Sequence, residues 1–287
     1  MKERSVAFYK RLIIFAALSI IIVIVGLLTF LVGGKLNLWE KKPVAERPET
    51  TVAATDEKKV TGSAIKEERV TVAAAISDNL SETERKVVYL TFDDGSSGNT
   101  SQILEILKEN RIKATFFFNT SEKQTADSII KETYDDGHAI GILTSSDYNY
   151  DTIYSSVDSY LEDFSKSYDR IYQITGQRPS ILRFPGGSIN AYDKDNYKAL
   201  TEEVTKRGFV YFDWNVCADD GSGKASTEAM IKNGTKLPGR ADKCIVLMHD
   251  NGNSNTCEAL KEIIRFYRDS GYVFEKLTAD VKPITFS

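Results

Sequence analysis

From residue 86 onward, short apolar segments alternate with amphipathic segments. The apolar segments are rich in β-branched and aromatic residues and predict strands, whereas the amphipathic ones have the apolar spacing of helices. Strands are expected at residues 87–92, 113–119, 138–143, 180–185, 209–216 and 244–250. Helices are expected at residues 100–110, 126–137, 155–176, 197–208, 226–236 and 256–271. This alternation favours an α/β domain with a parallel sheet, closed as a barrel or open and doubly wound.

The region before this domain has a different composition. Residues 12–34 form an uncharged apolar run of 23 residues, which as a helix crosses a hydrocarbon layer of roughly 30 Å. Basic residues outnumber acids before it, so residues 1–11 are predicted to be cytoplasmic and the rest exported. A cleaved signal peptide is the alternative, although the run is longer than usual for one. Residues 35–83 are polar and predict a flexible extracellular stalk before a domain at 84–287.

Charge and cysteine content narrow the possible functions. The net charge is −4, the pI is near 5.5, and no long run of Lys and Arg occurs. Nucleic acid is therefore not an expected partner. The chain has three scattered cysteines, Cys217, Cys244 and Cys257. They are expected to be core or free thiols, with one disulfide and a spare thiol as the alternative.

Polar residues recur at the expected strand ends, where parallel α/β folds place their chemistry. They are Asp93 and Asp94, residues 144–147, Arg183, Asp219 and Asp220, and His249. Because successive side chains of a strand alternate, Asp93 and Asp94 are expected to point apart and to have different roles. One acid would hold a metal and the other act as general base, with His249 as general acid and Arg183 keeping the base ionised. The alternative is an ordinary loop, in which an acid accepts backbone N–H bonds and Gly95 turns the chain.

The segment LTFDDGSSGNTSQILEILKENRIKATFF, residues 90–117, resembles the first motif of the polysaccharide deacetylase family, the NodB-homology carbohydrate esterases. The resemblance continues in the family's order through GHAIGILTSSD, RFPGG, DWNVCADDG and IVLMHD, and covers roughly residues 86–280. It implies a distorted (β/α)7 barrel, similar to a TIM barrel, that removes acetyl groups from N-acetylated sugars. The implied partner is an extracellular polysaccharide such as peptidoglycan or an N-acetylglucosamine polymer, and the implied cofactor is a divalent metal: zinc, manganese, cobalt or magnesium.

The resemblance also assigns roles to individual residues. It identifies Asp93 as the general base, Arg183 as its partner, His249 as the general acid and Asp220 as the acid that tunes His249. Asp94 matches a metal ligand. The implied substrate pocket contains Leu247, Trp214 and Gly186, the last where the family usually has an aromatic residue whose backbone N–H binds the oxyanion.

The second motif departs from the family pattern of two histidines, which complete the metal ligands. Leu143 and Asp147 stand at the corresponding positions, and only Thr144 keeps its type. Leucine cannot coordinate a cation, and the hard oxygen of Asp147 suits Mg²⁺, Ca²⁺ or Mn²⁺ better than Zn²⁺. Losing one ligand costs roughly 3 kcal/mol, about a hundredfold in affinity, so poor zinc occupancy is expected. If the alignment of this segment with the family's second motif were shifted by one or two residues, Asp151 would come near the cation. His138 matches a position that the family uses in packing.

Three functions therefore remain open. The first is a membrane-anchored polysaccharide deacetylase, weakened or adapted to a harder metal. The second is a catalytically inactive glycan-binding protein, suggested by the substituted second motif. The third is a glycosidase, which would need an acid from another strand at about 5–9 Å from the first, because neighbouring acids on one strand diverge.

Overall fold

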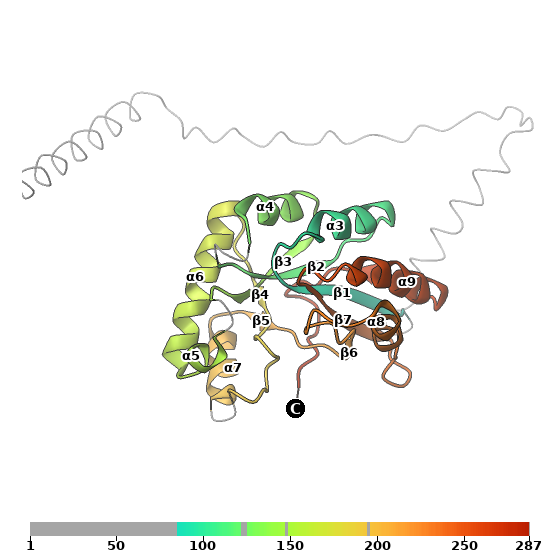
Figure 1. Cartoon of the computed structure of the whole chain (residues 1–287). Helices are drawn as coiled ribbons and strands as arrows, with labels where there is room; N and C mark the ends of the chain where they lie inside the picture. Colours follow the sequence, from blue (N-terminus) through green and yellow to red (C-terminus); the bar gives the residue numbers. More distant parts are fainter. Residues whose placement is uncertain (1–84, 122–124, 147–148, 194–195, 287) are drawn as a thin grey trace, which may run out of the picture. The chain divides into compact units, whose positions relative to one another are not determined.

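The computed structural model describes residues 85–286, apart from residues 122–124, 147–148 and 194–195 (Figure 1). The predicted membrane helix and stalk, residues 12–83, lie outside the described residues. Within the described part of the chain, no helix is both long and apolar enough to cross a membrane.

The strands are β1 (Val87–Asp94), β2 (Thr115–Asn119), β3 (Ala139–Thr144), β4 (Ile181–Leu182), β5 (Val210–Tyr211), β6 (Val216–Cys217), β7 (Lys243–Asp250) and β8 (Val273–Glu275). The helices are α3 (Thr100–Glu109), α4 (Asp127–Asp135), α5 (Tyr150–Ile153), α6 (Val157–Thr175), α7 (Tyr197–Lys206), α8 (Thr227–Gly234) and α9 (Asn255–Asp269).

The strands form one parallel sheet in the order β5-β4-β3-β2-β1-β7-β6, with β8 paired to the start of β1. The sheet curls into a half-barrel with the helices on its outside (Figure 1). This confirms the predicted parallel α/β domain, and the curled sheet is consistent with a distorted (β/α)7 barrel. Parallel pairing brings the carboxyl ends of β1, β3, β4 and β7 to the same end of the molecule.

The segment predicted as one strand at 209–216 is instead two short strands, β5 and β6. The N–H of Phe212 donates to the carbonyl of Leu182 at 3.0 Å, beside β4, whereas the N–H of Asn215 donates to the carbonyl of Ile245 in β7 at 3.2 Å. The chain therefore crosses from one edge of the sheet to the other within these residues. A continuous strand cannot make that crossing, although all residues of the segment except Asp213 and Asn215 are strand-forming types.

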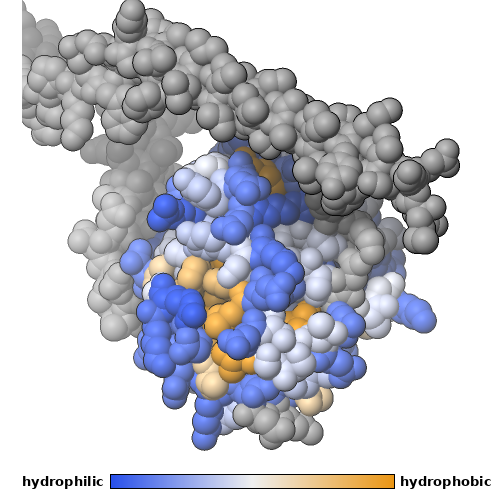
Figure 2. Space-filling view, turned by 90° about the vertical axis from the view of Figure 1, so that its left-hand side faces the viewer, coloured by the Kyte–Doolittle hydropathy of each residue, from blue (hydrophilic) through white to orange (hydrophobic). Residues whose placement is uncertain are grey.

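Apolar side chains fill both faces of the sheet. One cluster packs the outer face of β1, β2 and β7 against α3, α8 and α9, and a second packs α6 and α7 against β4. A third cluster fills the interior of the curl, where Phe117, Phe212 and Ile245 meet Leu143. Figure 2 shows the side of the molecule that carries α6, which is mainly hydrophilic with a hydrophobic area near its centre. Cys217, Cys244 and Cys257 are free thiols.

Candidate active site

The predicted site residues gather around a cavity of about 360 Å³ at the carboxyl ends of the strands. Asp93 and Asp94 end β1, and His249 lies beside Asp93 in the register of β1 and β7. The lining residues are Asp93, Asp94, Leu143, Tyr150, Pro185, Gly186, Trp214, Cys217, Asp219, Gly221, Ser222, Leu247 and His249. Arg183 and Asp220 lie behind this lining and contact Asp93 and His249. Asp147 lies outside the described residues.

Asp93 is held by a buried ion pair. An Nη1 atom of Arg183 lies 2.7 Å from Oδ1 of Asp93, and the arginine is fully buried. The same guanidinium donates to Oγ1 of Thr91 at 2.9 Å and to the carbonyl of Phe212 at 3.0 Å, and it lies 4.4 Å from the centre of the Phe117 ring. These contacts offset the cost of burying the guanidinium and fix its orientation.

The charge state of Asp93 reflects two opposing effects. Burial raises the pKa of the Asp93 carboxyl, while the charges of Arg183 and His249 act to lower it. The net direction is upward. A carboxylate with a raised pKa is a stronger base than an ordinary aspartate, which suits proton abstraction.

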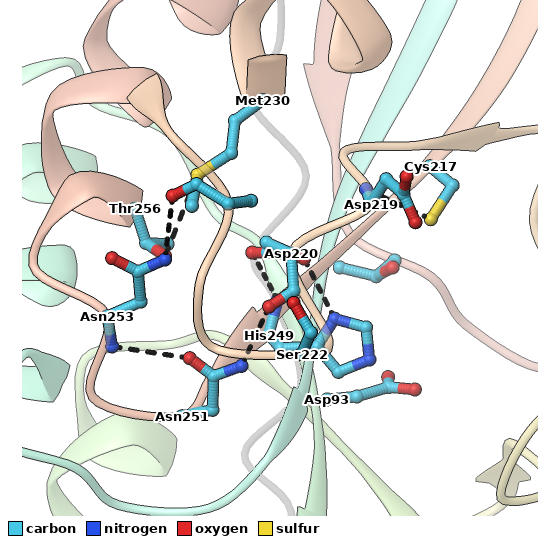
Figure 3. A network of polar contacts seen from close by, with 12 residues as sticks. Asp93, Cys217, Asp219, Asp220, Ser222, Met230, His249, Asn251, Asn253 and Thr256 are labelled. Atoms are coloured by element: carbon cyan, nitrogen blue, oxygen red, sulfur yellow. Dashed lines mark hydrogen bonds and ion pairs between the residues drawn. The ribbon is translucent and has the colours of Figure 1, made fainter. Parts of the chain in front are cut away.

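His249 forms a second pair, with Asp220 (Figure 3). Its Nδ1 lies 2.8 Å from Oδ1 of Asp220, and its backbone N–H donates to Oδ2 of the same residue at 3.0 Å. Burial alone would lower the pKa of His249, but the hydrogen bond with Asp220 and the charge of Asp93 raise it to about 9. The imidazole is therefore protonated at neutral pH, and with Nδ1 bonded to Asp220 its Nε2 is left for the cavity, as a general acid requires.

The backbone around Asp220 shapes this pair. Gly221 follows it, and a Cβ at that position would lie 3.2 Å from Cε1 of His249. Glycine therefore lets the chain pass close to the imidazole. The side chain of Asn251 donates to the carbonyl of Asp220 at 2.9 Å (Figure 3), which ties the β6–α8 connection to the end of β7.

Asp93 and Asp94 both line the cavity, although strand alternation predicts that their side chains point apart. Asp94 has a φ of 88°, in the left-handed region, so β1 loses its extended geometry at its last residue. Such a conformation is uncommon for a residue other than glycine and concentrates at functional sites. The positive φ of Asp94 lets it reach the cavity from the residue after Asp93.

The loop after Asp94 is fixed by a residue that the sequence did not single out, Asp250. Its carboxylate accepts hydrogen bonds from the hydroxyls of Ser97 and Thr100, and burial raises its pKa to about 6. Asp250 lies beside Asp94 in the β1–β7 register. The only signal in the sequence was its place after His249, which does not distinguish a structural acid from a catalytic one.

The apolar replacement in the second motif faces the cavity. The pairing of β2 with β3 shifts between Phe118 and Asn119, whose partners are Ile142 and Thr144. Leu143 is therefore the extra residue of a β-bulge, a feature that re-aims a side chain. It is buried and lines the cavity with Asp94, at the place where a metal ligand is expected.

The donor groups of the described residues do not form a complete metal site. In the ranges that the structure describes, no group of three or more His, Cys, Asp or Glu side chains is arranged to hold a metal ion. His138 does not compensate: it precedes β3, at the opposite end of the sheet, and its Nδ1 accepts a hydrogen bond from the N–H of Ala114 at 3.0 Å. Asp151 is exposed on α5.

Another buried acid supports the turn that contains Gly186, which has a φ of 81°. Asp213 accepts hydrogen bonds from the N–H and the hydroxyl of Ser188, at 2.8 and 2.5 Å, and from the N–H of Phe286 at 2.6 Å. The Phe286 ring packs edge-on against Trp214, with centroids 4.9 Å apart. Phe286 therefore contacts Trp214 and also bonds to Asp213, the acid that holds the Gly186 turn. No sequence pattern indicates these contacts.

Comparisons with known proteins find similar proteins among polysaccharide deacetylases. The family model described as polysaccharide deacetylase matches residues 80–204. Peptidoglycan-N-acetylmuramic acid deacetylase PdaA of Bacillus subtilis is 30% identical over 200 residues, covering 69% of this chain and 72% of its own length. The catalytic domain of peptidoglycan N-acetylglucosamine deacetylase from Eubacterium rectale superimposes with a TM-score of 0.66 at 33% identity, covering 72% of this chain and 95% of that domain. A polysaccharide deacetylase from Bacillus cereus gives a TM-score of 0.62 at 26% identity, covering 70% and 97%.

Proposed function

Because the chain belongs to the polysaccharide deacetylase family, we propose that it hydrolyses the N-acetyl groups of an extracellular glycan such as peptidoglycan. The observation that carries this proposal is the pair of dyads, Asp93–Arg183 and His249–Asp220, whose working residues line one cavity. Base and acid belong to neighbouring strands, which suits amide hydrolysis, in which the attacking water loses a proton and the leaving nitrogen gains one. The names of the relatives support peptidoglycan as the polymer.

The side chains supply a sequence of proton transfers. Asp93 accepts a proton from water as the oxygen adds to the acetyl carbonyl carbon, and the backbone N–H of Gly186 binds the developing oxyanion. His249 donates a proton to the sugar nitrogen as the C–N bond breaks, which releases acetate and a free amine. Leu247 provides an apolar wall for the acetyl methyl group.

The rate should be low compared with relatives that hold a complete metal site. A bound metal lowers the pKa of water from near 15.7 to about 7. Leu143 supplies no ligand, so the described residues do not provide this activation. The proposal therefore assigns to this chain a weakened deacetylase activity, carried by its acid–base pairs.

The proposal includes an anchor and an orientation. Residues 12–34 form a single membrane-spanning helix, residues 1–11 stay in the cytoplasm, and the domain lies outside the cell within reach of the cell wall. The support is the uncharged apolar run and the basic residues before it. Protease added outside intact cells should cleave the domain, and protection of the domain would contradict this orientation.

A second function, an inactive glycan-binding domain, is favoured by one observation: the apolar side chain of Leu143 lines the same cavity as Asp94. Without a metal ligand at that position, the cavity still offers apolar walls and hydrogen-bonding groups to a sugar. This alternative predicts oligosaccharide binding that a chelator does not change.

Acetate release separates the two functions. The full-length chain is incubated with N-acetylglucosamine oligomers and Mn²⁺, Co²⁺ or Zn²⁺, with a chelator, and with an active deacetylase as positive control. We expect slow release that His249→Gln abolishes and that Asp158→Asn, at an exposed aspartate on α6, leaves unchanged. No release with any metal, together with chelator-insensitive binding, would favour the inactive glycan-binding domain.

A further inference from the structure

Two tyrosines form an aromatic surface at the mouth of the cavity. Tyr150 begins α5 and lines the cavity, whereas Tyr192 lies between β4 and α7 and is 50% exposed. Their ring centroids are 5.2 Å apart and their planes differ by 50°. The two rings therefore adjoin at an angle, with that of Tyr192 open to solvent.

Exposed apolar side chains are concentrated in this region. Among the residues that the structure describes, the large hydrophobic side chains that are clearly exposed are Tyr172, Ile189, Tyr192 and Val273. Two of these four belong to the segment that follows the Gly186 turn. Exposed apolar groups gathered beside a cavity indicate a binding surface more strongly than scattered ones do.

The surface is also firmly positioned relative to the Gly186 turn. The side-chain amide of Asn190 donates to the carbonyls of Pro185 and Gly187, at 3.3 and 3.1 Å, and its oxygen accepts the N–H of Tyr192 at 2.8 Å. Tyr154, one turn from Tyr150, donates its hydroxyl to the carbonyl of Pro185 at 2.8 Å. Both tyrosines are therefore linked to the turn that faces the predicted acetyl position.

The chemistry of the pair suits a sugar ring. The faces of pyranose rings carry C–H groups that pack on aromatic rings, while tyrosine hydroxyls bond the sugar hydroxyls. Tyrosine also loses little conformational entropy on binding, because it has only two side-chain torsions. Burial and the charges of Asp94 and Asp93 raise the pKa of Tyr150 to about 12, so its hydroxyl stays protonated.

We propose that Tyr150 and Tyr192 form a subsite for a second pyranose ring of the glycan, adjacent to the sugar whose N-acetyl group enters the cavity. The choice of ligand rests on the proposed function. The subsite makes the chain prefer oligomers to single sugars, since a monosaccharide in the cavity does not reach Tyr192.

The test is a binding measurement that needs no turnover. Full-length chains that carry His249→Gln, so that the ligand is not consumed, are titrated with N-acetylglucosamine tetramer. Adding Tyr192→Ala should raise the Kd about tenfold, equivalent to about 1.4 kcal/mol, whereas Tyr192→Phe should keep most of the affinity because it keeps the ring. Tyr172→Ala is the matched control, since Tyr172 is 41% exposed on α6, and it should change nothing.

Each outcome decides the inference. Equal affinity of the Tyr192→Ala chain and its parent would overturn the subsite, as would a parent that does not bind the tetramer. An equal loss in the Tyr172→Ala chain would also overturn it, because the effect would then not be local to the cavity. Absence of acetate release by the wild-type chain would refute the proposed activity and leave this binding result intact.

Discussion

Replacing Asp220 with asparagine should shift the titration of His249 towards neutral pH. In the wild-type chain the pKa of His249 is raised from 6.5 to about 9, and the hydrogen bond with Asp220 is the largest of the contributions that raise it. A hydrogen bond to a charged group contributes about 1.5–3 kcal/mol, which corresponds to roughly one to two pH units. Because burial still acts to lower the pKa, the Asp220→Asn midpoint should fall to between about 7 and 8.

Histidine-labelled NMR measures this shift directly. The chain contains only two histidines, His138 and His249. Burial lowers the pKa of His138 to about 4, so only His249 should titrate between pH 6 and 10. The basic limb of the acetate-release profile should move by the same amount, since the general acid works in its protonated form. A wild-type midpoint near 6.5, or equal midpoints in both chains, would refute the reasoning.

Two further substitutions test the metal position and the loop after the paired acids. Leu143→His places an imidazole in the cavity that Asp94 lines and should raise zinc affinity about a hundredfold. The measurement is the zinc content per chain after dialysis. An unchanged zinc content would show that the side chain at position 143 does not face a zinc ion. Gly95→Ala puts a Cβ 1.9 Å from Oγ1 of Thr125 and should cost roughly 1–3 kcal/mol in the free energy of unfolding. Chemical denaturation checks this against Gly98→Ala, where nothing lies within 4 Å; equal stabilities would show that the loop adjusts freely.

The fold was largely predictable because each strand buried on both faces reads as a continuous apolar run. The expected strand at 87–92 lies within β1, and the expected helix at 197–208 contains all of α7. The error at 209–216 arose where local residue type and long-range pairing disagree. Phe212 and Asn215 pair with opposite edges of the sheet, and no local pattern encodes which edge a residue joins.

The site was predictable only in part, for a similar reason. The acids of β1 and His249 stand at strand ends, a position that the sequence locates well. The joint presence of Asp93 and Asp94 at one cavity depends on the φ of 88° at Asp94, which strand alternation cannot anticipate. Asp213 and Asp250 support the site through hydrogen bonds to distant hydroxyls and N–H groups, so their roles appear only in three dimensions.

Each of the two dyads has a structural role as well as a chemical one. Arg183 is fully buried and cannot lose its proton, so Asp93 is needed as its counter-charge whether or not the site is active. Removing one partner of a buried ion pair costs roughly 3–5 kcal/mol, and an inactive Asp93→Asn chain would not separate lost chemistry from lost folding. The side chain of His249 is 19% exposed, but its partner Asp220 is fully buried, so His249 likewise supplies the counter-charge of a buried group. Acetate release by the wild-type chain, set against oligosaccharide binding by the His249→Gln chain, is therefore the observation that distinguishes a working deacetylase from a glycan-binding relative.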